Sequence, residues 1–216
     1  MSPKVPKSPP LLRVRGLERH FGDLHLLNGL DLEVRSGEAL ALIGPNGAGK
    51  STALRCIAGA DKATAGTVEL DGAVLDERSP ATRRDLAVVM DDLDFFPDLS
   101  VVEHLNLLAR AHRVADADAV VDAVLEDVGL VGQAAQLPGT LSSGQRRRLA
   151  LASAFVRPRR LLILDEPEQR LDAEGLAWLA DRLNAEKADG LGILLVSHDP
   201  QLVDAVADWV LDLGGE

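Results

Sequence analysis

A glycine-rich turn between an apolar segment and a helical pattern is the feature that most constrains the fold. Residues 39–43 read ALALI, which is typical of a strand buried on both faces. Residues 44–51 read GPNGAGKS, and the helical pattern that follows, KSTALRCIAG, ends at Gly59, a residue type that often terminates helices. A strand, a turn and a helix in immediate succession predict an α/β core.

The turn fits the pattern G-x-x-x-x-G-K-[ST] in full and stands where that pattern is informative, after a strand and before a helix. Its glycines allow positive φ and bring backbone N–H groups around a phosphate, while the helix N-terminus adds partial positive charge. Lys50 can reach β- and γ-phosphate oxygens, and Ser51 can offer a hydroxyl to Mg²⁺. The predicted nucleotide-binding residues here are Gly44, Pro45, Asn46, Gly47, Ala48, Gly49, Lys50, Ser51 and Thr52.

A second apolar segment ends in two adjacent acids. Residues 161–166 read LLILDE, and a buried charge is costly unless something pairs with it. Solvated acids at an ordinary strand end are the alternative. Beside a phosphate-binding loop, however, Asp165 is predicted to hold Mg²⁺, and Glu166 to orient or deprotonate an attacking water. Lys50, Glu166 and, by the resemblance described below, His198 are the predicted catalytic residues.

Composition excludes several classes of function. The chain has 216 residues, 46% of them hydrophobic, enough for one core or one core with a sub-lobe. A formal net charge of -11 argues against a nucleic-acid partner. The single cysteine, Cys56, fits a reducing compartment, and no apolar run approaches the roughly 20 residues of a membrane helix. We therefore expect a cytoplasmic protein with a flexible N-terminal arm, residues 1–10.

The remaining patterns predict a mixed β core with an inserted helical lobe, together forming one domain over residues 11–216. Several short strands are expected over residues 11–43. Helices are expected over about residues 99–157, with a capping box at Ser100 and Glu103 and the Arg146–Arg148 run as a solvated helix face. Strands and helices then alternate over 160–166, 172–190, 192–197, 199–207 and 208–213.

These motifs, in their order, resemble the ATP-binding subunit of an ABC transporter. Beside the phosphate loop, LSSGQ at residues 141–145 is similar to the family's LSGGQ signature, and His198 in LLVSHD to its switch histidine. Phe21 in RHFGD matches the aromatic residue that stacks on adenine. The resemblance covers about residues 11–213 and implies an α/β P-loop NTPase fold of the ABC ATPase type.

The resemblance also implies partners. Two subunits, or this one and a related ATPase subunit, would close head to tail on two ATP molecules. The signature residues Ser142, Ser143, Gly144 and Gln145 would then contact the γ-phosphate held by the other subunit's Lys50. Closure and reopening would drive a polytopic membrane permease from the cytoplasmic face of the membrane.

Three positions depart from the family pattern. Asp91 stands where the family usually carries a glutamine that touches Mg²⁺, so Asp91 is a further candidate metal ligand. Ser143 replaces a glycine in the signature, and Gln169–Arg170 replace the start of a serine-containing segment at the dimer interface. The altered loop at Asp91 favours one alternative, a non-transport ATPase that switches a soluble partner. A metabolic kinase with the same phosphate loop is a further alternative, but that function would not account for LSSGQ at residues 141–145.

Overall fold

The computed structural model describes residues 9–91 and 94–214, and its strands form two sheets. The antiparallel sheet has the order β2-β1-β4-β5, with β1 Leu12–Phe21, β2 Leu24–Val34, β4 Ala65–Leu70 and β5 Ala73–Val74. The parallel sheet has the order β6-β7-β8-β3-β9, with β6 Leu86–Val89, β7 Leu161–Asp165, β8 Gly192–Val196, β3 Ala39–Ile43 and β9 Trp209–Asp212.

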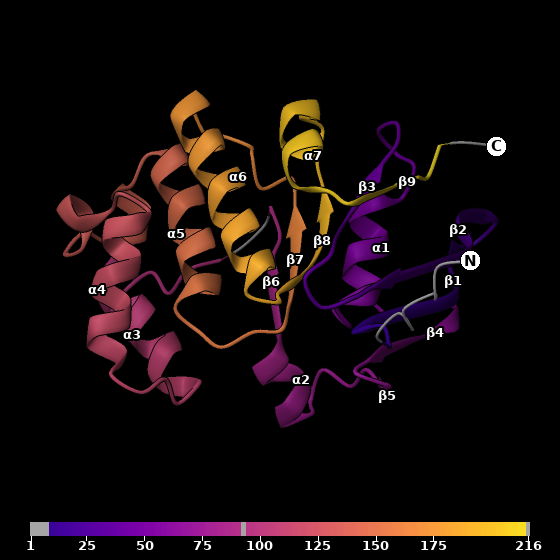
Figure 1. Cartoon of the computed structure of the whole chain (residues 1–216), viewed down its shortest axis with the longest axis horizontal. Helices are drawn as coiled ribbons and strands as arrows, with labels where there is room; N and C mark the ends of the chain where they lie inside the picture. Colours follow the sequence, from indigo (N-terminus) through magenta and orange to yellow (C-terminus); the bar gives the residue numbers. More distant parts are fainter. Residues whose placement is uncertain (1–8, 92–93, 215–216) are drawn as a thin grey trace, which may run out of the picture.

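Helices connect and cover these strands. Their bounds are α1 Lys50–Ile57, α2 Pro80–Asp85, α3 Val101–Ala111, α4 Ala117–Asp127, α5 Ser143–Phe155, α6 Ala173–Ala188 and α7 Pro200–Val206, with 3-10 turns at Val131–Gln133 and Pro138–Thr140. Helices α3, α4 and α5 lie in sequence between the paired strands β6 and β7, and they gather at the end of the molecule opposite the antiparallel sheet (Figure 1). The predicted fold class, an α/β core with an inserted helical lobe, is confirmed.

The two faces of the parallel sheet belong to two separate cores. Along β3, Ala39 and Ala41 face the core shared with the helical lobe and α6. Leu40 and Leu42 face the other core, which includes Leu54 of α1 and the inner side chains of the antiparallel sheet. Helix α1 is therefore held between both sheets, and this packing fixes the position of its N-terminal turn, where the phosphate loop ends.

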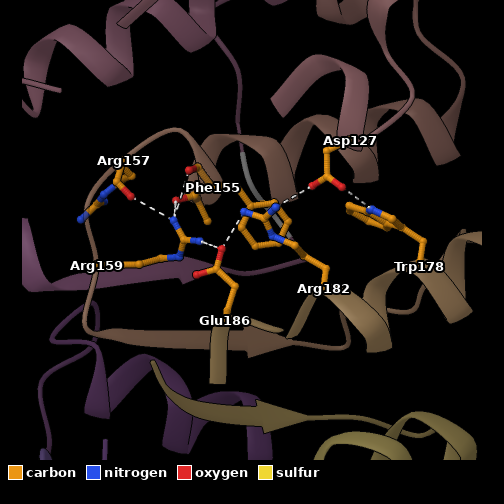
Figure 2. A network of polar contacts seen from close by, with 8 residues as sticks. Asp127, Phe155, Arg157, Arg159, Trp178, Arg182 and Glu186 are labelled. Carbon is orange, nitrogen blue, oxygen red and sulfur yellow. Dashed lines mark hydrogen bonds and ion pairs between the residues drawn. The ribbon is translucent and has the colours of Figure 1, made fainter. Parts of the chain in front are cut away.

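A polar network ties the helical lobe to α6. The carboxylate of Asp127, at the end of α4, accepts hydrogen bonds from Trp178 Nε1 and Arg182 Nη1, both at 3.0 Å. Arg182 also donates to Glu186 at 2.6 Å, and Glu186 pairs with Arg159, which follows α5 (Figure 2). The network therefore links helices α4 and α6 with the segment that leads into β7.

The N-terminal strands differ from the prediction of several short ones. The region folds into two long strands, β1 and β2, whose pairing carries register shifts between Val14 and Leu17 and between Leu17 and His20. Gly16 and Gly29 have positive φ within these strands and do not end them. Bulges of this kind bend a strand without ending it.

Most other boundaries follow the sequence pattern. The capping box at Ser100 and Glu103 is present, and Gly59 takes a positive φ of 78° just after α1. Residues 1–8 of the predicted N-terminal arm and residues 215–216 of the predicted domain lie outside the described residues. Within 9–91 and 94–214, no helix combines the length and apolar character that crossing a membrane requires.

Candidate active site

The chemistry-bearing segments meet at one edge of the parallel sheet. Strands β7, β8 and β3 are adjacent and parallel, so their carboxyl ends lie side by side. Asp165 and Glu166 stand at the end of β7, His198 follows β8, and the phosphate loop follows β3. A pocket of about 400 Å³ opens there, lined by Leu26, Asn46, Gly47, Gly49, Lys50, Ser51, Thr52, Glu166 and His198. Leu26, on β2, has no chemical signature in the sequence and was not predicted.

The phosphate loop has the backbone that its glycines predict. Gly44, Gly47 and Gly49 have φ of 137°, 84° and 88°. A Cβ on Gly49 would lie 3.0 Å from Leu27 Cδ2 and 3.1 Å from the Leu26 carbonyl oxygen, so a side chain is excluded there. The buried Lys50 donates from Nζ to the carbonyl oxygens of Gly44 at 2.8 Å and Pro45 at 3.0 Å. Its ammonium group is thus held within the loop, where phosphate oxygens would be stronger acceptors.

Asp165 and Ser51 offer two hard oxygen ligands side by side. The hydroxyl of Ser51 donates to Asp165 Oδ1 at 3.1 Å. Burial raises the pKa of Asp165, the negative charges of Glu166 and Asp91 raise it further, and the Ser51 hydrogen bond and the charge of Arg147 oppose the shift. No group of three or more histidine, cysteine or acidic residues in the described segments could hold a metal alone. Mg²⁺ suits such a site, since it keeps several waters and needs few protein ligands.

Glu166 points into the pocket from a strained turn. Its φ is 46°, a left-handed conformation that is uncommon for residues with a side chain. His198 Nε2 lies 3.3 Å from Glu166 Oε1, and Gln169 Nε2 donates to the other oxygen, Oε2. A carboxylate held in this way beside a phosphate-binding loop can orient a water and accept its proton.

Arg147 overturns the expectation of a solvated Arg146–Arg148 face. Its side chain is 3% exposed, and its guanidinium donates to four carbonyl oxygens, those of Met90, Asp165, Glu166 and Pro167. Burial lowers the pKa of Arg147. Position 147 shares one helical face with Ala150, Leu151 and Ala154, all of them buried, but positions 146 and 148 also have apolar neighbours at this spacing, so the sequence does not single out Arg147. Arg147 clamps the strained turn at Glu166 to the end of β6.

The structure does not bring every predicted site residue to the pocket. Phe21 lies at the end of β1, 50% exposed, with the Arg19 guanidinium carbon 4.3 Å from its ring centroid. The signature residues start α5, where Ser142 and Gln145 form a reciprocal capping box and Ser142 and Ser143 are exposed. Neither Phe21 nor the signature is among the described residues that line the pocket. Their contacts with ATP stay predictions.

Asp91 also lies apart from the pocket. Its Oδ1 is 3.2 Å from Arg170 Nη1, and the two side chains are 47% and 45% exposed. With Arg146 and Arg147 they line a separate hollow of about 130 Å³. The predicted role of Asp91 as a metal ligand stays a prediction.

Comparison with known proteins agrees with this geometry. A family model described as "ABC transporter" matches residues 27–169. The glutamate transport ATP-binding protein GluA of Corynebacterium glutamicum is 31% identical over 207 residues, which cover 93% of this chain and 86% of that protein. The chain belongs to the ABC transporter family.

Further relatives place it among the ATP-binding subunits. The Nod factor export ATP-binding protein I of Cupriavidus pinatubonensis is 35% identical over 98% of this chain, which spans 66% of that protein's length. A solved structure of an ATP-binding subunit of an ABC transporter matches with a TM-score of 0.88 and 30% identity, over 94% of this chain and 86% of that one. The protein is therefore an ATP-binding subunit with the P-loop fold and an ATPase.

Proposed function

We propose that this ABC ATP-binding subunit hydrolyses Mg²⁺–ATP in a head-to-tail dimer and drives a separate polytopic membrane permease from the cytoplasmic side. One observation carries the proposal. Lys50, Ser51, Glu166 and His198 share a single pocket, whereas the signature residues at the start of α5 do not line it, and Ser142 and Ser143 are exposed. The signature of one subunit therefore does not contact the nucleotide in its own pocket, and in the proposed dimer the second subunit supplies this contact.

Each residue of the pocket has a role that its chemistry supports. Lys50 and the loop amides bind the β- and γ-phosphates, and Ser51 and Asp165 hold Mg²⁺, which neutralises charge on the phosphates. Glu166 orients the attacking water and takes its proton, and His198 contacts this carboxylate and lines the same pocket. Phe21 stacks on the adenine.

In the dimer, the hydroxyls of Ser142 and Ser143 and the N–H groups at the start of α5, with Gly144 and Gln145, face the γ-phosphate bound to the other subunit. A helix N-terminus favours an anion there. Association costs several kcal/mol of lost freedom, so we expect the dimer to close only when ATP bridges both surfaces. Hydrolysis then removes the bridge, and the reopening moves the permease.

Transport is favoured over the switching of a soluble partner by the relatives, whose names describe both import and export. Examples are a spermidine/putrescine import protein of Pseudomonas aeruginosa and the Nod factor export protein. Because these relatives include both importers and exporters, the transported cargo and the direction of transport are to be determined by experiment.

The test of dimerisation uses Glu166→Gln, which keeps the shape of the side chain and removes the base. We expect turnover to fall about 100-fold or more, as loss of a general base implies, while ATP still binds. Light scattering should then find a dimer with Mg²⁺–ATP and a monomer with Mg²⁺–ADP. Unchanged turnover would reject Glu166 as the base, and a monomer under both conditions would reject ATP-dependent closure between two copies of this chain.

The test of the permease uses the same variant, tagged and purified with ATP from gently solubilised native membranes. Mass spectrometry should find a polytopic membrane protein in stoichiometric amount. Recovery of a soluble partner in its place would contradict the transport proposal and support the switch.

A further inference from the structure

Each oxygen of the Glu166 carboxylate has a polar side-chain neighbour, and one of the two neighbours is a residue that departs from the family pattern. His198 Nε2 lies 3.3 Å from Oε1, and the side-chain amide of Gln169 donates to Oε2. Gln169 stands where the resemblance leads one to expect serine. We propose that Gln169 is a positioning residue that fixes the carboxylate of Glu166 for water activation. This inference rests on the proposed role of Glu166 as the general base.

The loop that carries Gln169 is held at its start. Arg147 donates to the carbonyl oxygens of Asp165 and Glu166, and Glu166 N donates to the Val196 carbonyl oxygen at 2.8 Å. Gln169 N in turn donates to the Glu166 carbonyl oxygen at 3.1 Å, which closes a tight turn. Gln169 and Glu166 are thus joined through their backbones as well as through their side chains.

The loop is also held at its other end. The Leu171 N–H donates to the carbonyl oxygen of Glu168 at 3.1 Å, and Arg170 pairs with Asp91 at 3.2 Å. The side chain of Glu168 adds a link to the segment that follows β8, because its Oε1 accepts the His198 N–H at 2.8 Å. Residues 166–171 therefore form a turn that hydrogen bonds and an ion pair hold at both ends, and this turn directs the Gln169 side-chain amide toward the Glu166 carboxylate.

An amide suits this position chemically. Its NH₂ group donates to a carboxylate without adding a charge and without titrating. A general base loses efficiency when its orientation is not fixed, since misplacement of about 1 Å can cost 10²-fold in rate. A serine at position 169 would be shorter and would lack the reach of the glutamine side chain. Each carboxylate oxygen keeps a further lone pair with which to accept a hydrogen bond from water.

The experiment compares Gln169→Ala, which removes the donor, with Gln169→Glu, which keeps the size and replaces the donor by an acceptor. We expect kcat for ATP hydrolysis to fall about tenfold in Gln169→Ala and further in Gln169→Glu, with KM for ATP within about twofold of the wild type. If Gln169 only filled space, Glu would restore the rate that Ala loses. A Glu variant nearer to the wild type than the Ala variant, or a rise of kcat in the Ala variant, would overturn the proposal.

A second measurement shows whether Gln169 acts through Glu166. Single-turnover rates are taken for Glu166→Gln and for the double variant Glu166→Gln/Gln169→Ala. We expect the second change to cost less than twofold in this background, because the base it positions is gone. A full tenfold further loss would overturn the proposal.

The same data separate this inference from the proposal on which it rests. A Glu166→Gln variant with normal turnover would reject Glu166 as the base. A large loss in Glu166→Gln together with a wild-type rate in Gln169→Ala would reject only the positioning role. Melting temperatures of all the variants, and their dimerisation on ATP, control for unfolding and for altered subunit pairing.

Discussion

The buried Arg147 gives the most direct test of how the site is held together. The substitution Arg147→Met keeps an unbranched apolar stem of similar length and removes the guanidinium. Four carbonyl oxygens, those of Met90, Asp165, Glu166 and Pro167, then lose a charged donor. Each buried carbonyl oxygen left without its donor costs about 1–3 kcal/mol, so the four together would cost about 4–12 kcal/mol.

The opposing contribution is the desolvation of the guanidinium, which the substitution relieves. The side chain is 3% exposed, and its lowered pKa reflects that burial. Since the effective penalty for burying one ion is several kcal/mol, we expect a net destabilisation of about 2–4 kcal/mol. For a chain of this size, that corresponds to a fall in melting temperature of about 5–15 °C.

Calorimetry or urea unfolding measures this loss, and the neighbouring arginine provides the matched control. Arg146 is exposed and donates to the Leu141 carbonyl oxygen at 3.2 Å, so Arg146→Met should change the free energy of unfolding by no more than about 0.5 kcal/mol. Equal losses in the two variants would refute the assignment of Arg147 as the clamp. So would an Arg147→Met protein as stable as the wild type.

Three further predictions concern Asp165, Phe21 and Asp91. Burial raises the pKa of Asp165, so the folded state carries a cost that grows as pH rises above the ordinary range of aspartate. Without Mg²⁺, the Asp165→Asn variant should therefore melt about 2–4 °C higher than the wild type at pH 7.5, and this difference in melting temperature should shrink toward pH 4. A variant that melts lower than the wild type at pH 7.5 would contradict this expectation. Phe21→Ala should raise KM for ATP about tenfold with kcat within about twofold, as loss of base stacking implies, whereas an unchanged KM would exclude the stacking role. Asp91→Asn should lower the free energy of unfolding by less than about 1 kcal/mol, because the ion pair of Asp91 with Arg170 is half-exposed. If the Asp91 carboxylate binds the metal, the same substitution should raise the Mg²⁺ concentration for half-maximal turnover several-fold. An unchanged Mg²⁺ concentration would rule out Asp91 as a metal ligand.

Several features of the protein could be predicted from local sequence patterns alone. The phosphate loop requires glycine where φ is positive and a lysine at a helix start, and both conditions are local. The capping boxes at Ser100 and Ser142 likewise involve residues three positions apart. Five apolar residues in a row marked β3 as a strand buried on both faces, and the structure places it inside the parallel sheet. Such features can be predicted from a single sequence because the interacting groups are close along the chain.

The contacts around Glu166 depend on groups far apart in the chain. The order β7-β8-β3 brings Asp165, His198 and Lys50 to one edge, and the side chain of Arg147 reaches carbonyl groups from residue 90 to residue 167. Which of three consecutive arginines is buried depends on which face of α5 meets the sheet, and Asp91 meets Arg170 only because β6 lies beside β7. The sequence by itself determined the chemistry of the loop and the acids. Tertiary packing decided which donor reaches which acceptor, because hydrogen bonds and ion pairs depend on distances in space that separation along the chain does not fix.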